Sequence, residues 1–211
     1  MIKTPYLLFL GDAPDQLAAK VGQGIRDWRP DISLGQIRLP GCKADLGLPD
    51  YTLEEAKNAG AKTLIVGVAN RGGTFSSTWK ETLCKALDLK FDIASGLHNL
   101  LSEEKDFTDL ARSNECKLFD VRIPSEIFPV ANGKKRSGMR CLTIGTDCSA
   151  GKMYSTLALE QEMLSRGKKA TFRATGQTGI LISGSGIPLD AVVADFMAGA
   201  VEALTPDSDA D

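Results

Sequence analysis

Residues 140–167 read RCLTIGTDCSAGKMYSTLALEQEMLSRG, and this stretch decides the fold expected for the second half of the chain. The apolar run 142–144 is typical of a buried strand. A loop bounded by Gly145 and Gly151 follows, and Lys152 then opens a segment in which apolar residues recur at helical spacing. The pattern predicts a strand, a glycine-bounded loop and a helix in succession.

Such a loop is suited to bind phosphate. The first backbone N–H groups of a helix have no partner inside the helix, and the helix dipole places positive potential at the same end. Lys152 adds a full positive charge there. We therefore predict that the loop before Lys152 binds phosphate, and the alternative is an ordinary turn between a strand and a helix.

The loop departs from the standard phosphate loop, G-x-x-x-x-G-K-[ST], in two ways. Five residues instead of four separate Gly145 from Gly151, and Met153 occupies the position of the hydroxyl that ligates magnesium. A thioether is a poor ligand for magnesium, which prefers oxygen. Ser155 and Thr156 carry hydroxyls, but they point to other sides of the helix. Phosphate binding is therefore better supported than phosphoryl transfer.

The composition limits the class of protein. The chain has 211 residues, of which 43% are hydrophobic and 25% charged, with a net charge of −2. This balance provides no broad basic surface for nucleic acid or an anionic membrane. The five cysteines are odd in number and form no C-x-x-C pair, which indicates a reduced cytoplasm and favours neither a disulfide framework nor a metal site. The apolar run near the N-terminus is too short for a signal peptide or a membrane span.

The first half alternates short apolar runs with amphipathic segments, which predicts an α/β fold with a parallel sheet. Expected strands lie at 6–10, within 32–39, and at 62–68, 91–94 and 117–121. Helices are expected at 17–28, 52–60 and 102–113, and a further one begins at Thr78. The first should turn Leu17 inward, and the second begins with a Thr52–Glu55 capping box. The helix from Thr78 should place Trp79, Leu83 and Leu87 in the core.

Prolines, glycines and the charged run 134–136 interrupt every periodicity between residues 123 and 138, and we place the domain boundary there. The predicted domains are residues 1–130 and 131–211, and the charged run is interpreted as a solvated linker. After the phosphate loop we expect a strand at 169–174, a glycine-rich loop at 175–179 and a helix near 194–204. A phosphate-loop domain normally needs more strands than the two or three that this part of the sequence offers. We therefore expect either a truncated domain or a sheet whose remaining strands are supplied from elsewhere.

Two resemblances follow from longer motifs. The loop GTDCSAGKM is similar to that of dethiobiotin synthetases, which continue with Thr where this chain has Met153. Nearly the whole chain, including LGDAPDQLAAKVGQGIRDWRP, IRLPGCKADLGLPDYT and RATGQTGILISGSGIPLDAVVADFMAGAVE, resembles a family catalogued as a domain of unknown function that includes D-glutamate N-acetyltransferases. The resemblance implies a Rossmann-like domain followed by a phosphate-loop NTPase-like domain, members that extend beyond the end of this chain, and a homo-oligomer.

This resemblance also implies a reaction, the transfer of acetyl from acetyl-CoA to the amino group of D-glutamate or a related amino acid. Coenzyme A carries several phosphates, and its thioester chemistry has no obligatory magnesium. We assign its phosphates to residues of the loop and the first helical turns, namely Gly145, Thr146, Ser149, Gly151, Lys152 and Thr156. The alternatives are an ATP-dependent ligase or kinase of dethiobiotin synthetase type, with ATP and magnesium, and a non-catalytic nucleotide-binding sensor.

An amino-acid acceptor needs cations for its carboxylates and a base for its ammonium group. For the carboxylates we select three arginines near expected strand ends, Arg38, Arg71 and Arg173. For the base we rank Asp147 and His98 first, with Asp12 and Asp195 behind them. Three of these residues have a structural role as the alternative to a functional one. Asp147 could brace the loop, His98 could be a hydrogen-bonded structural residue, and Arg71 could be a solvated charge. Cys148 is a weaker candidate for a nucleophile, because direct transfer needs none.

Overall fold

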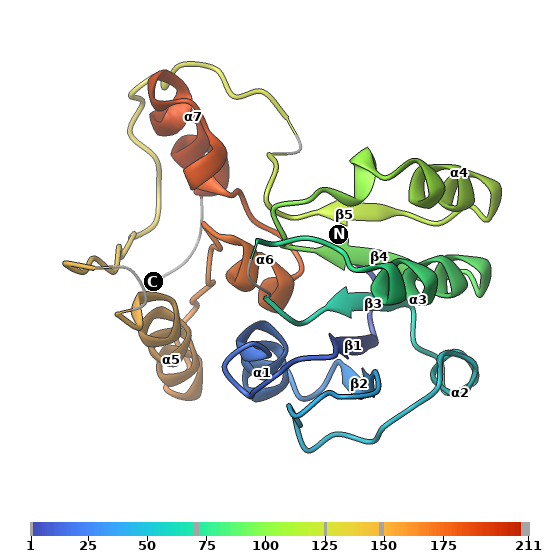
Figure 1. Cartoon of the computed structure of the whole chain (residues 1–211). Helices are drawn as coiled ribbons and strands as arrows, with labels where there is room; N and C mark the ends of the chain where they lie inside the picture. The colour runs from blue at the N-terminus through green and yellow to red at the C-terminus, as the bar shows by residue number, and fades with distance from the viewer. Residues whose placement is uncertain (1, 70–71, 125, 148–149, 208–211) are drawn as a thin grey trace. The chain divides into compact units, whose positions relative to one another are not determined.

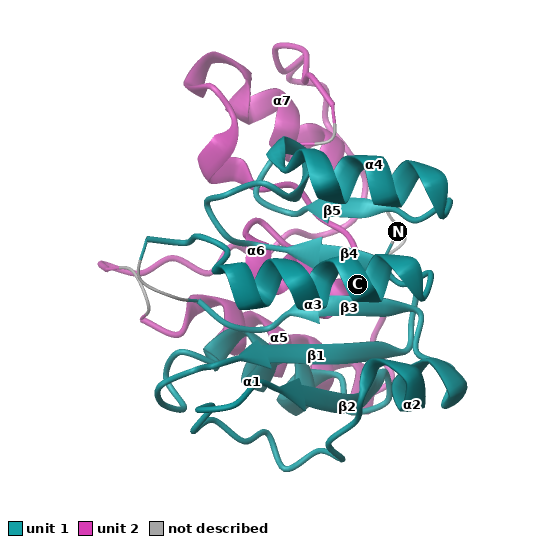
Figure 2. Ribbon diagram, turned by 45° about the vertical axis from the view of Figure 1, so that its right-hand side comes forward, with its two compact units in different colours: residues 1–123 teal, residues 124–211 magenta. Residues whose placement is uncertain are grey.

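The computed structural model describes residues 2–69, 72–124, 126–147 and 150–207 (Figure 1). The chain divides into two compact units, Met1–Ile123 and Pro124–Asp211, which Figure 2 colours separately. The division falls within the proline- and glycine-rich stretch at which the sequence predicts a boundary. Arg71, Cys148 and Ser149 lie outside the described residues.

Unit 1 is a parallel five-stranded sheet with helices, as the alternating pattern predicts. Its strands lie in the order β2-β1-β3-β4-β5, and every neighbouring pair is parallel. The strands are β1 Tyr6–Gly11, β2 Ser33–Arg38, β3 Thr63–Val66, β4 Asp92–Ser95 and β5 Leu118–Asp120. The helices are α1 Lys20–Trp28, α2 Leu53–Asn58, α3 Ser77–Asp88 and α4 Lys105–Ser113, with the short 3₁₀ helix η1 Leu101–Glu103.

The core of unit 1 lies around the central strands. All residues of β1, β3 and β4 are buried, and β1 and β3 are almost wholly apolar, whereas β4 also buries Asp92 and Ser95. Helices α3 and α4 lie next to each other over the sheet (Figure 2). Trp79, Leu83 and Leu87 of α3 are buried, as predicted. The prediction for Leu17 is wrong, because α1 begins only at Lys20 and leaves Leu17 in the preceding loop with 74% of its surface exposed.

The helix ends of unit 1 match the predicted capping residues in one case and differ from them in two. Thr52 and Glu55 form the predicted capping box, in which Thr52 Oγ1 accepts a hydrogen bond from Glu55 N at 3.2 Å. The predicted start of α3 at Thr78 is wrong, because Ser76 Oγ accepts from Trp79 N and the helix begins at Ser77. The segment expected to be a single helix at 102–113 contains two helices, η1 and α4, and Asp120 accepts hydrogen bonds from the backbone amides of Leu101 and Ser102 in η1.

Unit 2 contains α5 Lys152–Ser165, α6 Gln177–Ser183, η2 Leu189–Ala191 and α7 Ala194–Leu204. The helices expected after the phosphate loop and near residues 194–204 are confirmed. The glycine-rich segment 175–179 was expected to be a loop, but α6 begins inside it. Ile180, Leu181 and Ile182 of this helix are buried, so burial of their side chains accounts for a helix that the local glycines disfavour.

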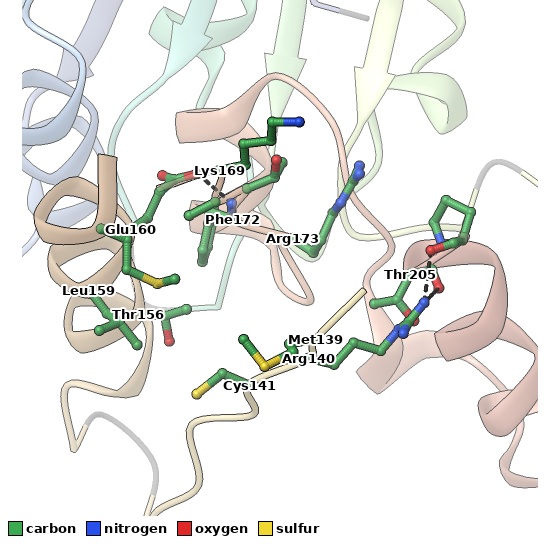
Figure 3. A pocket seen from close by; sticks show the side chains of 14 residues that line it. Met139, Arg140, Cys141, Thr156, Leu159, Glu160, Lys169, Phe172, Arg173 and Thr205 are labelled. Atoms are coloured by element: carbon green, nitrogen blue, oxygen red, sulfur yellow. Dashed lines mark hydrogen bonds between the residues drawn. The ribbon is translucent and has the colours of Figure 1, made fainter. Parts of the chain in front are cut away.

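Neither strand expected in unit 2 is present in the described part of the chain. Leu142 and Ile144 are 80% and 81% exposed, and residues 169–174 also have no strand structure. Residues 139–141, which precede the first of these segments, and residues 169–173 line a cavity of about 360 Å³ together with side chains of α5 (Figure 3). A strand requires a hydrogen-bonded neighbour, and within the described residues neither segment belongs to a sheet.

Residues 129–138, which we call the strap, run along α7. The backbone amides of Asn132 and Gly133 donate to the Glu202 carboxylate at 3.0 and 2.9 Å, and these bonds hold the pKa of Glu202 below its ordinary value. Arg136 donates to the carbonyl oxygens of Glu202 and Thr205 at the carboxyl end of α7. The interpretation of 134–136 as a solvated linker is therefore wrong for Arg136, which caps a helix.

In the part of the chain that the structure describes, no helix combines the length and the apolarity that crossing a bilayer would require.

Candidate phosphate-binding site

Gly151 and α5 have the backbone geometry that the sequence predicts for the junction between the loop and the helix. Gly151 is the last residue before the helix and has φ +85°, a conformation that favours glycine, while a Cβ atom there would meet open space. Lys152 is the first helical residue. The positive φ turns the chain so that α5 starts immediately after the loop, and the first N–H groups of a 14-residue helix lie beside it.

Lys152 closes the loop from the helix side. Its Nζ donates a hydrogen bond to the carbonyl oxygen of Asp147 at 2.5 Å. Its aliphatic stem crosses Gly145, since a Cβ atom on that glycine would lie only 3.2 Å from Lys152 Cδ. The two ends of the predicted loop are thus brought together around one ammonium group. Gly145, Thr146 and Asp147 are exposed.

The hydroxyl of Thr156 has a structural partner. Thr156 Oγ1 lies 2.6 Å from Thr143 Oγ1, and it donates to the carbonyl oxygen of Lys152 at 2.9 Å. These contacts brace α5 against the segment that leads into the loop. Met153 is half-buried in the first turn of the helix. A phosphate contact by Thr156 would require its hydroxyl to leave these partners, and that role stays a prediction.

The cavity of unit 2 brings two predicted residues to one place, Thr156 and Arg173. Figure 3 shows Thr156, Leu159 and Glu160 on α5, facing the segment that carries Phe172 and Arg173. The lining combines apolar and charged side chains from four segments: Met139, Arg140, Cys141, Thr156, Leu159, Glu160, Met163, Lys169, Ala170, Thr171, Phe172, Arg173, Thr205 and Pro206. Asp195 lies elsewhere in the unit, in the first turn of α7.

The remaining candidates lie in unit 1, at the carboxyl ends of its strands. His98 follows β4 and is exposed, and its ring and backbone come within 3.0 Å of the position that a Cβ atom on Gly73 would take. Arg38 ends β2 and forms two hydrogen bonds with Asp50, one of them 2.7 Å long, which raise the pKa of Arg38. Its guanidinium group is already engaged, and its role in binding a carboxylate stays a prediction.

One contact at this edge was not foreseen. Asp12 follows β1, and its Oδ1 accepts a hydrogen bond of 2.8 Å from the indole Nε1 of Trp79. The helical spacing of Trp79, Leu83 and Leu87 predicted only a core position for Trp79. The two residues are 67 positions apart, and no local pattern connects them.

Comparisons with known proteins agree with this architecture. Residues 37–124 match the Rossmann-like domain model of DUF1611, a family of unknown function, and residues 129–211 match its P-loop domain model. A crystal structure of a DUF1611 family protein from Anabaena variabilis superposes with a TM-score of 0.78 at 28% identity, covering 96% of this chain and 62% of that one.

Two curated relatives carry the name D-glutamate N-acetyltransferase. The protein from Tritonibacter scottomollicae is 66% identical over 211 residues, and the one from a Pseudoalteromonas species is 45% identical over 208. The alignments cover 100% and 99% of this chain, which spans 63% of the length of each relative. With both domain models matched in order, the chain belongs to the DUF1611 family.

Proposed function

We propose that the protein transfers the acetyl group of acetyl-CoA to the amino group of D-glutamate or a closely related amino acid. Two relatives that align with the whole or nearly the whole of this chain are named for this activity. The proposal also includes a cytoplasmic location and a homo-oligomeric assembly, with no nucleic-acid or membrane partner.

The observation that carries the proposal is the phosphate loop with Met153 in its first helical turn. Lys152 and the backbone N–H groups at the start of α5 provide the donors that a pyrophosphate needs. The position after Lys152 offers only a thioether, and the Thr156 hydroxyl is bonded to Thr143 and to the Lys152 carbonyl. This set of donors fits the phosphates of CoA better than a nucleotide whose terminal phosphates are bridged by magnesium.

CoA, when bound, supplies the acetyl group as an activated thioester. In the overall reaction the acceptor ammonium loses two protons, its nitrogen bonds to the acetyl carbon, and the carbon–sulfur bond breaks. One of the two protons is taken up by the leaving sulfur, which becomes a thiol, and the other is released. Lys152 and the loop amides hold the phosphates, with Ser149 as a further candidate. Asp147 or His98 takes the proton from nitrogen.

The carboxylates of the acceptor need cations, and Arg173 is a good candidate in unit 2. Its guanidinium lies at the wall of a cavity, and Arg offers a planar pair of donors to a carboxylate. Arg71 is kept as a second candidate. Arg38 would have to exchange Asp50 for the substrate, which makes it the least favoured of the three.

The test incubates the protein, at the full length that its gene encodes, with acetyl-CoA and a panel of D- and L-amino acids, and follows release of free thiol. We expect release with D-glutamate that is well above the rate without an amino acid and unchanged by EDTA. Hydrolysis of ATP that needs magnesium, together with no thiol release for any amino acid, would instead support a ligase or kinase. Binding of ATP without turnover of either compound would support a sensor.

A further inference from the structure

The carboxylate of Asp12 is held at a fixed point on the edge of the sheet. Asp12 is exposed, but both of its neighbours, Gly11 and Ala13, are buried. Backbone hydrogen bonds hold the turn on either side, from Leu39 N to the Gly11 oxygen and from Lys43 N to the Ala13 oxygen, both 2.8 Å long. The side chain therefore projects from a rigid turn.

Trp79 positions this carboxylate from the buried core of unit 1. Its side chain is only 2% exposed, and its ring packs edge-on against Phe9 of β1 with 5.4 Å between ring centroids. Its Nε1 donates to Asp12 Oδ1. The indole reaches this position only because residue 11 is glycine, since a Cβ atom there would lie 2.5 Å from the ring. Three residues from two distant segments are thus fitted together at the end of one strand.

Asp12 differs from those aspartates of unit 1 that have a cation as their partner. Asp50 is paired with Arg38, and Asp92 lies 3.0 Å from the ammonium group of Lys3. Within the described ranges, Asp12 has a hydrogen bond only from a neutral indole, which fixes one oxygen without cancelling the negative charge. The remaining lone pairs of an exposed carboxylate stay available to donors.

The place of Asp12 in the topology is where open parallel sheets bind ligands. From β1 the chain continues to β2 on one side, and β3 lies on the other, so the strand order reverses at β1. Ligands of such sheets bind beyond the carboxyl ends of the strands at this point. Asp12 is the first residue after β1, and His98 follows β4, two strands along the same edge.

We infer that Asp12 binds the ammonium group of the amino-acid acceptor and that Trp79 is the positioning residue for this contact. The inference rests on the proposed function, which requires an acceptor amine. An ammonium group brings three donors and a positive charge, and it complements a carboxylate that has no ion pair with any described residue. Asp12 also repels the carboxylates of the acceptor, which orients the amine toward β1.

The test uses the indole N–H resonances of the 211-residue chain, which has two tryptophans. Trp79→Phe identifies the Trp79 signal. We expect D-glutamate to shift this signal in a saturable manner, whereas glutarate, which lacks the amine, leaves it in place. In Asp12→Asn the amide oxygen still accepts from the indole, but the negative charge is lost. We expect the affinity for D-glutamate to fall about tenfold or more.

The matched control is Asp15→Asn, which removes a negative charge three residues further on. Asp15 Oδ1 accepts from Ala18 N, a bond that asparagine preserves, and this variant keeps the wild-type affinity. Trp79→Phe retains an aromatic ring against Phe9 but removes the indole N–H that holds Asp12. Because the charge of Asp12 remains, we expect calorimetry to show a smaller loss of D-glutamate affinity than in Asp12→Asn.

Two results would overturn the inference. One is equal affinity for D-glutamate in wild type and Asp12→Asn, and the other is a Trp79 signal that no amino acid shifts. The thiol-release assay separates these failures from a failure of the proposed function. Undiminished release by Asp12→Asn refutes the role of Asp12 alone. Ammonium binding that Asp12→Asn abolishes, in a protein that releases no thiol, refutes acetyl transfer alone.

Discussion

Replacing Lys152 with alanine is expected to lower the affinity of the chain for acetyl-CoA by about 30-fold or more, because a charge-assisted contact to phosphate contributes roughly 2 kcal/mol or more. Lys152 Nζ is the cation that closes the loop, where it donates to the Asp147 carbonyl. A phosphate oxygen would replace this carbonyl as its acceptor. Isothermal titration calorimetry with acetyl-CoA measures the change directly.

Two further variants separate charge from packing. Lys152→Met retains an aliphatic stem over Gly145 but has no ammonium group, and we expect it to lose nearly as much affinity as the alanine variant. Lys135→Ala removes an exposed lysine from the same unit and should bind acetyl-CoA as the wild type does. If Lys152→Met bound normally, the contribution of Lys152 would be packing, and a phosphate contact would be refuted.

Gly11→Ala is expected to destabilise unit 1 by about 3 kcal/mol or more, which combines left-handed backbone strain with overpacking in the core. Gly11 has φ +52°, and an added methyl group would lie 2.5 Å from the Trp79 ring. The ring is buried against Phe9 and cannot retreat without opening the core. Urea denaturation followed by circular dichroism gives the free energy of unfolding.

Gly41→Ala is the matched control for this substitution. Gly41 also has a positive φ, +92°, but an added Cβ atom has no heavy atom within 4 Å. It should therefore cost only the backbone strain, about 1–2 kcal/mol. Equal losses of stability in the two variants would mean that the Gly11–Trp79 contact does not constrain the fold.

The sequence predicted best those structural features that depend on only a few consecutive residues. The Thr52–Glu55 capping box needs only four consecutive residues, and the buried strands β1 and β3 are recognisable because they are almost wholly apolar. Leu17 was misplaced because apolar spacing does not reveal where a helix begins. The same limit applies to α3, where Ser76 and Thr78 are both chemically suitable caps and only Ser76 bonds to a helical amide.

Features that depend on distant partners were beyond a local pattern. Residues 142–144 have the composition of a strand, but a strand also needs a neighbour, and neither they nor residues 169–174 belong to a sheet in the described part of unit 2. Arg136 belongs to a charged run that is typical of a solvent-exposed segment, yet its guanidinium group donates to the carbonyl oxygen of Glu202 in α7, 66 residues away. The pairing of Asp12 with Trp79 is of the same kind.

For the candidate site, the sequence predicted the local geometry of the loop better than its surroundings. Glycine at 151 and lysine at 152 together predict a turn into a helix, which the structure contains. The second contact of Thr156, with Thr143, depends on how α5 packs and could not be derived from spacing. His98 and Asp147 belong to different units, and their roles stay predictions.

The most direct measurement concerns the backbone amides of the loop. Amide nitrogen–proton correlation spectra of the 211-residue chain should be recorded during titration with acetyl-CoA, with and without magnesium. We predict saturable shifts for Gly145, Thr146, Gly151 and Lys152 that do not require magnesium. Shifts confined to other parts of the chain, or shifts of these amides only with ATP and magnesium, would contradict a site that holds the phosphates of CoA.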